Sequence, residues 1–169
     1  MAKSQKRGTP PKAAMYRNLD AQLRSLLHDE RDFIANSANA SSLIYNALPD
    51  INWAGFYIHK QGELVVGPFQ GKSACVRIAI GTGVCGKAAF EQRTIIVENV
   101  LEFPGHIACD AASRSEIVVP TLHKGSLVAV LDIDSPKVAR FDAADKAGLE
   151  TLVKTFTTLT DCSDSPIVT

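Results

Sequence analysis

The 169-residue chain carries no net charge at pH 7, because 18 basic side chains balance 18 acidic ones. It therefore lacks the basic excess by which many nucleic-acid-binding proteins are recognised. Its apolar runs are shorter than the roughly 18 residues that a membrane-spanning helix needs, and it contains no internal repeat. These absences argue against a nucleic-acid partner, a membrane helix and a fibrous repeat.

The N-terminal segment lacks the apolar stretch of a secretory signal peptide. Residues 1–20 hold five basic residues and one acid, which leaves 13 basic and 17 acidic residues, a net charge of −4, in the rest. We expect a disordered basic tail over residues 1–15, with a short transit peptide as the alternative. A single domain over residues 16–162 and a flexible tail over 163–169 should follow. The expected location is cytoplasmic.

Hydrophobic residues make up 46% of the chain, and a chain of this size can bury about 70% of its unfolded surface. Helical spacing of leucines predicts two helices over 16–48, or one helix broken near His28. Alternating patterns predict strands at 52–60, 63–66, 75–80, 94–97, 115–123 and 126–134. A short helix is expected at 83–92, and a last helix after Asp142. This order predicts an α+β fold, with the terminal helices on one face of an antiparallel sheet.

The segment from Gly81 to Gly86 matches the G-x-G-x-x-G pattern of dinucleotide-binding folds, after a strand and before a helix. The chain lacks the series of βαβ units that such a fold requires, so we do not expect dinucleotide binding. The segment does place Cys85 near a helix N-terminus. Free backbone N–H groups at that position should lower the pKa of a thiol.

The four cysteines, at positions 75, 85, 109 and 162, include no C-x-x-C pair, which disfavours a zinc ribbon. Cys75 and Cys85 can be small buried hydrophobic residues, or they can join His106 and Cys109 as metal ligands. Cys109 differs because it lies in a long predicted loop, 98–114, where access is greater. It is the candidate reactive thiol, and His106 could lower its pKa.

Acidic side chains gather on two predicted strands. Asp132 and Asp134 are two residues apart and share one face, and hairpin pairing can bring Glu116 close to them. Three such carboxylates need a cation, either a metal or a substrate ammonium, unless they lie at solvated strand ends. Trp53 and Tyr57 share a face of another strand. Aromatic rings beside anions suit a cationic or methyl-bearing ligand.

Five motifs between about residues 51 and 142 resemble those of the free methionine-R-sulfoxide reductase family, which is built on a GAF domain. They are NWAGFY, GPFQGKSACVRI, GTGVCGKAA, GHIACDAASRSEIVVP and LDIDSP, in this order. The resemblance implies a GAF fold, with terminal helices on one face of a central antiparallel sheet and the pocket on the other. It also implies that the substrate is the free amino acid.

The resemblance implies that Cys109 is the nucleophile, which attacks the sulfoxide sulfur and is left as a sulfenic acid. Cys75 would then form a disulfide with it, with Cys85 as an alternative or relay. NADPH-linked thioredoxin would be the external reductant, and no bound cofactor or metal is implied. Cys162 lies outside the motifs and receives no role. The family likeness is also compatible with a homodimer.

The same resemblance gives roles to the aromatic and acidic residues. Trp53 would pack on the substrate methyl group, with Tyr57 beside it, and Glu116, Asp132 and Asp134 would hold the ammonium. Protonation of Glu116 or Asp134 could assist loss of the sulfoxide oxygen. Two alternatives stay open: a GAF domain that only binds a small molecule and signals, and a thiol-peroxidase-like redox sensor that does not need the acids.

Overall fold

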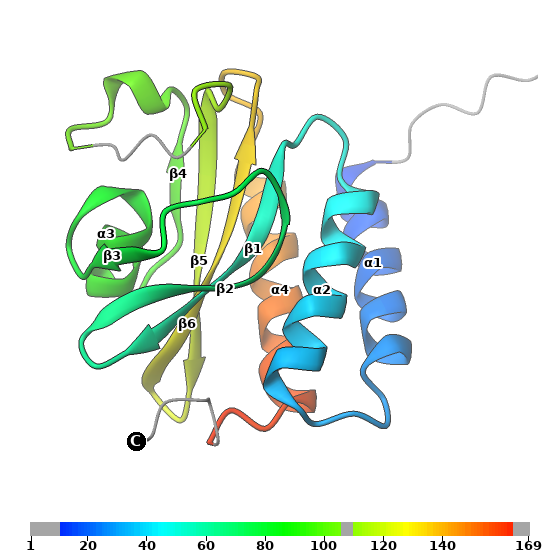
Figure 1. The fold of residues 1–169 in the computed structure, drawn as a ribbon. Coiled ribbons are helices and arrows are strands. Elements are labelled where there is room, and N and C mark those ends of the chain that lie inside the picture. Colours follow the sequence, from blue (N-terminus) through cyan, green and yellow to red (C-terminus); the bar gives the residue numbers. More distant parts are fainter. Residues whose placement is uncertain (1–10, 106–109, 164–169) are drawn as a thin grey trace, which may run out of the picture.

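The computed structural model describes residues 11–105 and 110–163, which form a six-stranded antiparallel sheet with helices on both faces (Figure 1). The strand order is β3-β2-β1-β6-β5-β4. The strands are β1 (Trp53–Lys60), β2 (Glu63–Gly71), β3 (Arg77–Ala79), β4 (Ile95–Val97), β5 (Ser115–His123) and β6 (Ser126–Ser135). The α+β prediction and the predicted order of elements are confirmed.

Three helices cover one face of the sheet: α1 (Lys12–Leu26), α2 (Phe33–Ala47) and α4 (Ala143–Leu159). The short helix α3 (Gly83–Glu91) lies on the opposite face, and a 3-10 turn, η1 (Val100–Glu102), interrupts the long loop. The N-terminal region therefore forms two helices. Asp32 begins the second by accepting a hydrogen bond from the amide of Ala35 at 2.7 Å, as a helix N-cap does.

The first helix begins earlier than the expected domain boundary at residue 16. Lys12 lies within 2.7 Å of a carboxylate oxygen of Asp142, at the start of α4, and it also pairs with the fully buried Asp145. The hydroxyl of Tyr16 donates to Asp145 at 2.8 Å. These ties to α4 order residues 12–15, so the expected tail over residues 1–15 extends too far.

The strands also differ from expectation at the β2–β3 edge. β2 continues to Gly71, whereas β3 is confined to Arg77–Ala79 because it pairs only with Glu63–Val65 of β2. Cys75 was expected to open this strand, but it lies in the preceding loop and is half-buried.

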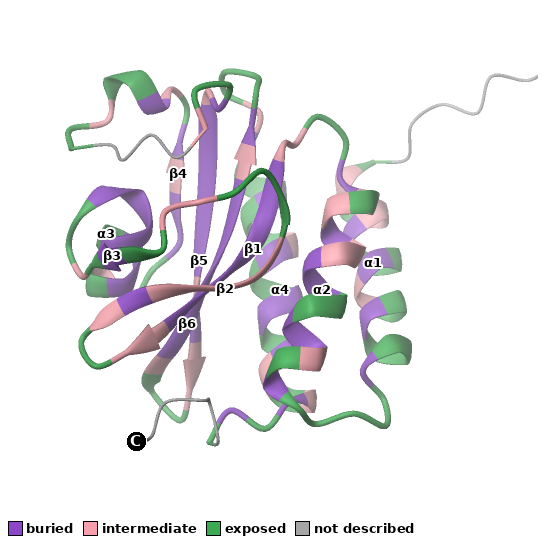
Figure 2. Ribbon diagram, in the orientation of Figure 1, coloured by how far each residue is buried: buried purple, intermediate pink, exposed green. Residues whose placement is uncertain are grey.

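Two hydrophobic cores lie on opposite faces of the sheet, as the alternation of buried residues along each strand requires (Figure 2). The larger core packs the sheet against α2 and α4, on which α1 packs in turn, and the smaller core packs the sheet against α3. Within the described residues, no helix is long and apolar enough to cross a membrane. The candidate site residues on the strands belong to the α3 face.

Candidate functional site

Strand register brings the three predicted acids together. Glu116 of β5 pairs with Asp134 of β6, and Asp134 pairs on its other side with Trp53 of β1. Asp132 lies two residues before Asp134, on the same face, and pairs with Gly55. Glu116 and Asp132 are each 6% exposed, and Asp134 is half-buried. The alternative in which these acids sit at solvated strand ends is therefore wrong.

An aromatic wall stands beside the acids. Trp53 and Tyr57 are buried and stack with ring centroids 5.8 Å apart. Trp53 also stacks on Phe69 of β2 at 5.2 Å, and its indole nitrogen donates to the carbonyl oxygen of Lys72 at 3.1 Å. These contacts fix the indole plane, so it offers a rigid apolar surface to a ligand.

Gly55 makes room for this arrangement, a role that sequence reasoning missed. It lies between Trp53 and Tyr57 on the same face of β1. A Cβ there would lie 2.7 Å from Cη2 of Trp53 and would collide with Cβ of Phe69. Any side chain at position 55 would displace the indole ring, so the aromatic wall requires glycine here.

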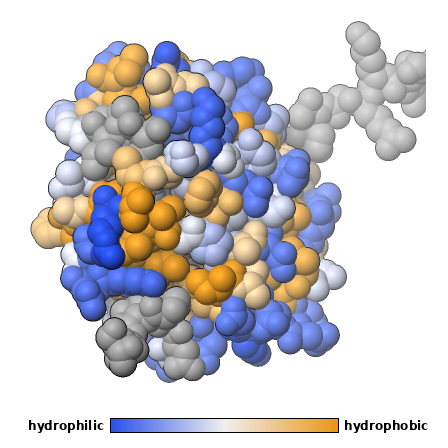
Figure 3. All heavy atoms as spheres, viewed as in Figure 1, coloured by the Kyte–Doolittle hydropathy of each residue, from blue (hydrophilic) through white to orange (hydrophobic). Residues whose placement is uncertain are grey.

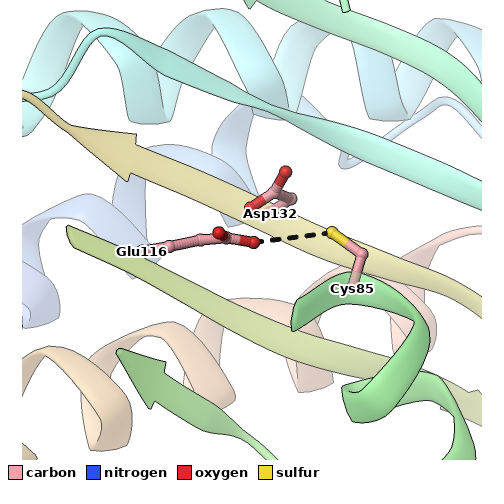
Figure 4. Close-up of side chains that lie close together, drawn as sticks. All are labelled: Cys85, Glu116 and Asp132. Carbon is pink, nitrogen blue, oxygen red and sulfur yellow. Dashed lines mark hydrogen bonds between the residues drawn. The ribbon is translucent and has the colours of Figure 1, made fainter. Parts of the chain in front are cut away.

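Cys85 enters the acid cluster from the opposite side. It lies in the first turn of α3, which places its thiol 3.8 Å from Oε1 of Glu116, with Asp132 close by (Figure 4). The side chain is 4% exposed. Helix α3 thus closes the cluster with a buried thiol rather than with a basic residue.

The electrostatics of the cluster follow from burial and mutual repulsion. Burial raises the pKa of Asp132 to about 7. Burial, reinforced by the charge of Asp132, raises the pKa values of Glu116 and Asp134 well above their usual range. Both effects disfavour the ionised form of these carboxyl groups, and a cation that bound here would displace their protons.

The predicted lowering of the Cys85 pKa is wrong. Burial, followed by the charges of Asp132 and Glu116, raises the pKa of this thiol well above its ordinary value. The local pattern showed only the helix N-terminus, while the opposing carboxyl groups come from distant strands. Cys85 is therefore a protonated thiol at neutral pH, and a protonated thiol is a poor nucleophile.

These groups line a pocket with about 530 Å³ of empty space, counting its open mouth. No basic side chain is among the described residues that line it. They are Trp53, Tyr57, Ser73, Ala74, Ile78, Gly83, Val84, Cys85, Asp110, Ser113, Glu116, Asp132 and Asp134. Such a lining suits a small ligand with a positive charge and an apolar part.

Asp110 anchors the chain at this pocket, and nothing in the sequence pattern singled it out. Its carboxylate accepts from the amide of Ala112 at 2.9 Å, from Nδ2 of Asn52 at 3.2 Å and from Nζ of Lys72 at 3.3 Å. These donors, the Ala112 amide foremost, lower the pKa of Asp110. Asn52 and Asp110 are 58 residues apart, and only the fold brings them together.

The cysteines of the chain differ from one another in oxidation state and in location. Cys75 is disulfide-bonded, whereas Cys85 and Cys162 are free thiols. Cys162 is buried in the helical core, away from the pocket face. Cys109 and His106 lie outside the described residues. The structure thus sets Cys85 and Cys162 apart from the half-buried, oxidised Cys75.

Apolar side chains gather over the region of α3, β3 and β2 on the face shown in Figure 3. Val76 and Phe90, which belong to this part of the chain, are 63% and 73% exposed. Val76 directly follows the oxidised Cys75. An apolar surface beside a half-buried, oxidised cysteine is a feature that a protein partner can use.

We expect Asp132→Asn to raise the stability of the ligand-free protein at alkaline pH. A carboxyl whose pKa is raised on folding contributes its full stability below the unfolded pKa, and this is lost as the pH rises through about 7. Asparagine does not ionise. The melting temperature of the Asp132→Asn variant at pH 8 should therefore exceed that of the unsubstituted protein by at least about 3 °C. This difference in melting temperature should shrink toward pH 4.

Thermal unfolding followed by circular dichroism at several pH values checks this prediction. Asp29→Asn is a matched control, because the Asp29 side chain is 93% exposed. A loss of stability of equal size at every pH would contradict the argument, because it would mean that Asp132 contributes through its packing rather than its ionisation.

Comparison with known proteins places this site in context. A GAF-domain model matches residues 36–159, which confirms the predicted GAF fold. Over 142 residues the chain is 50% identical to a free methionine-R-sulfoxide reductase of Escherichia coli, an alignment covering 84% of this chain and 86% of that protein. It is 49% identical over 131 residues to the Saccharomyces cerevisiae enzyme of the same name, covering 73% of each chain.

The fold is also similar to that of a solved structure. The X-ray structure of free methionine-R-sulfoxide reductase from Neisseria meningitidis, in complex with its substrate, superposes with a TM-score of 0.88. The two sequences are 41% identical, and the match covers 95% of this chain and 96% of that one. The likeness therefore extends over nearly the whole of both chains.

Proposed function

Because the chain belongs to the GAF-domain family of free methionine-R-sulfoxide reductases, we propose that it reduces free L-methionine-R-sulfoxide to methionine. The observation that carries this proposal is the pocket in which Glu116, Asp132 and Asp134 face the ring of Trp53. The α-ammonium of a free amino acid would bind the acids, and the methyl group on the sulfoxide sulfur would pack on the indole. A ligand that matches this pocket is small, with a cationic group for the acids and an apolar group for the indole.

The buried acids supply selectivity for the free amino acid. An ammonium near Asp132 favours the ionised carboxylates and lowers their pKa values. The bound cation therefore offsets part of the free-energy cost of burying these charges. A peptide-bound methionine sulfoxide has no ammonium at this position. The acids would then stay without a cationic partner, which disfavours the peptide.

The proposed chemistry uses two thiols. The Cys109 thiolate attacks the sulfoxide sulfur, the oxygen passes to Cys109 as a sulfenic acid, and methionine leaves. A proton is needed for this step. Burial raises the pKa values of Glu116 and Asp134, so the one of these two that keeps its proton beside the bound ammonium is the proposed donor. The thiol of Cys75 then condenses with the sulfenic acid, which releases water and leaves a disulfide.

The oxidised state of Cys75 supports its role as the main resolving cysteine. Cys85 is the alternative, but its protonated, buried thiol makes it the slower attacker. Thioredoxin, reduced in turn through NADPH, would reopen the disulfide, and the exposed Val76 offers it apolar surface beside Cys75. Such recycling fits a reducing compartment such as the cytoplasm.

The decisive assay measures methionine release from free L-methionine-R-sulfoxide, with dithiothreitol in one arm and thioredoxin, thioredoxin reductase and NADPH in another. The free S epimer, N-acetyl-methionine-R-sulfoxide and a peptide-bound R-sulfoxide run in parallel. We expect turnover of the free R epimer and at least about 100-fold slower turnover of the acetylated form, which lacks the ammonium.

Two results would contradict the proposal. One is the absence of turnover in a folded, fully reduced sample, especially if methionine still binds, which would favour the sensor. The other is equal turnover of free and peptide-bound sulfoxide, which would remove the role given to the acids. Failure in the thioredoxin arm alone would overturn only the proposed reductant.

A further inference from the structure

On the face of the sheet that α3 covers, one thiol and two carboxyl groups lie close together in an arrangement that fits a metal ion. One possible ligand atom from each of Cys85, Glu116 and Asp132 lies within 4.8 Å of the other two. The three side chains come from α3, β5 and β6 and point toward one another (Figure 4). All three are buried, so their positions are fixed by the sheet and by the first turn of the helix.

A second observation points to a ligand at this place. Among residues 11–105 and 110–163, no donor reaches the buried Oδ1 of Asp132, although the residue is only 6% exposed. A buried carboxylate oxygen without a donor is costly, and most such atoms in folded proteins have a partner. No basic side chain among the described pocket residues is available to supply one.

The donor set selects the kind of cation. Thiolate and carboxylate together are typical of Zn²⁺, which binds sulfur at about 2.3 Å and carboxylate oxygen at about 2.0–2.2 Å. Hard cations such as Mg²⁺ avoid sulfur. Sγ of Cys85 and Oε1 of Glu116 lie 3.8 Å apart, close to the roughly 3.6 Å that these bond lengths give at a tetrahedral zinc.

We propose that Zn²⁺ binds to Cys85, Glu116 and Asp132 and thereby inhibits the protein by occupying the place of the substrate ammonium. Binding releases the proton of the Cys85 thiol and any proton on the carboxyl groups of Glu116 and Asp132 to solvent, and it involves no change of oxidation state. The binding site is argued from the cluster alone, whereas the competition with substrate rests on the proposed function. The ion is an inhibitor in this proposal and takes no part in catalysis.

Direct binding is measured on the Cys75→Ser, Cys109→Ser double variant, so that only the thiols of Cys85 and Cys162 remain. Co²⁺ is the probe, because a thiolate ligand gives it a near-ultraviolet charge-transfer band, and Zn²⁺ should abolish that band at one equivalent. We expect the band to disappear in a further Cys85→Ser variant. Asp132→Asn should weaken binding at least about 100-fold, since even outer-shell partners of a metal contribute 10–100-fold.

Cys162→Ala is the matched control, because this buried thiol lies in the helical core. Three results would each overturn the metal site. The double variant could show no cobalt–thiolate band, the band could survive Cys85→Ser, or it could be lost in Cys162→Ala. Circular dichroism verifies folding of every variant. Should Asp132→Asn unfold, Glu116→Gln tests the same prediction.

Competition is tested by adding free methionine to the cobalt-loaded double variant. We expect methionine to abolish the band, and N-acetyl-methionine, which lacks the ammonium, to leave it in place. A band that resists methionine, although calorimetry detects methionine binding to the metal-free protein, would overturn the inhibition. If methionine does not bind the metal-free protein at all while cobalt still does, the proposed substrate fails and the metal site stands.

Discussion

Replacing Cys109 with serine should reduce methionine release from the free R-sulfoxide at least about 1,000-fold, because the proposed nucleophile is then absent. Cys75→Ser should behave differently. It should release one methionine per protein without added reductant and should lose thioredoxin-dependent turnover, because the sulfenic acid forms but no disulfide follows. Rapid-mixing assays of methionine, combined with trapping of the sulfenic acid by dimedone, measure both effects.

Cys162→Ala should retain the activity of the unsubstituted protein, since this thiol lies in the helical core. Turnover that persists in Cys109→Ser would contradict the mechanism. Loss of thioredoxin coupling in Cys85→Ser, with Cys75→Ser unaffected, would transfer the resolving role to the buried thiol.

Asp132→Asn should raise the KM for free L-methionine-R-sulfoxide about 100-fold, with a smaller change in kcat. The substitution keeps the shape of the side chain but removes its charge. Removing one partner of a buried ion pair typically costs 2–5 kcal/mol, and about 2.8 kcal/mol corresponds to 100-fold in affinity. Steady-state kinetics and calorimetry with methionine give the two values independently.

Asp29→Asn serves as control, because it makes the same chemical change at an exposed residue outside the pocket lining. N-acetyl-methionine-R-sulfoxide provides a second control, since a substrate without an ammonium should respond little to the loss of Asp132. An unchanged KM together with a lowered kcat would contradict an ammonium-binding role and would indicate that Asp132 acts in proton transfer.

Local patterns predicted the elements because each signal lies within a few residues. The leucine spacing, the Asp142 cap of the last helix and the alternation of the strands are all properties of short segments. The extent of β3 was not predictable in this way. Its length depends on which residues of β2 it pairs with, and this pairing left Cys75 outside the strand.

The part of the site that could be predicted consists of residues that share one face of the same strand. The two-residue spacing of Asp132 and Asp134 and the four-residue spacing of Trp53 and Tyr57 both carry over to the α3 face. The electrostatics were not predictable, because the groups that raise the pKa of Cys85 come from strands 31 or more residues away. The tie between Asn52 and Asp110 is equally a product of the fold.

The glycine at position 55 limits how this pocket can be redesigned. Its floor along β1 accepts no side chain without moving Trp53 and Phe69, so the floor offers a protein engineer nothing to trim or enlarge. The pocket lining also contains Ile78 and Val84, whose side chains can be shortened. A variant intended for a sulfoxide with a longer S-alkyl group should therefore be sought at those two positions, with the aromatic wall and the acids left as they are.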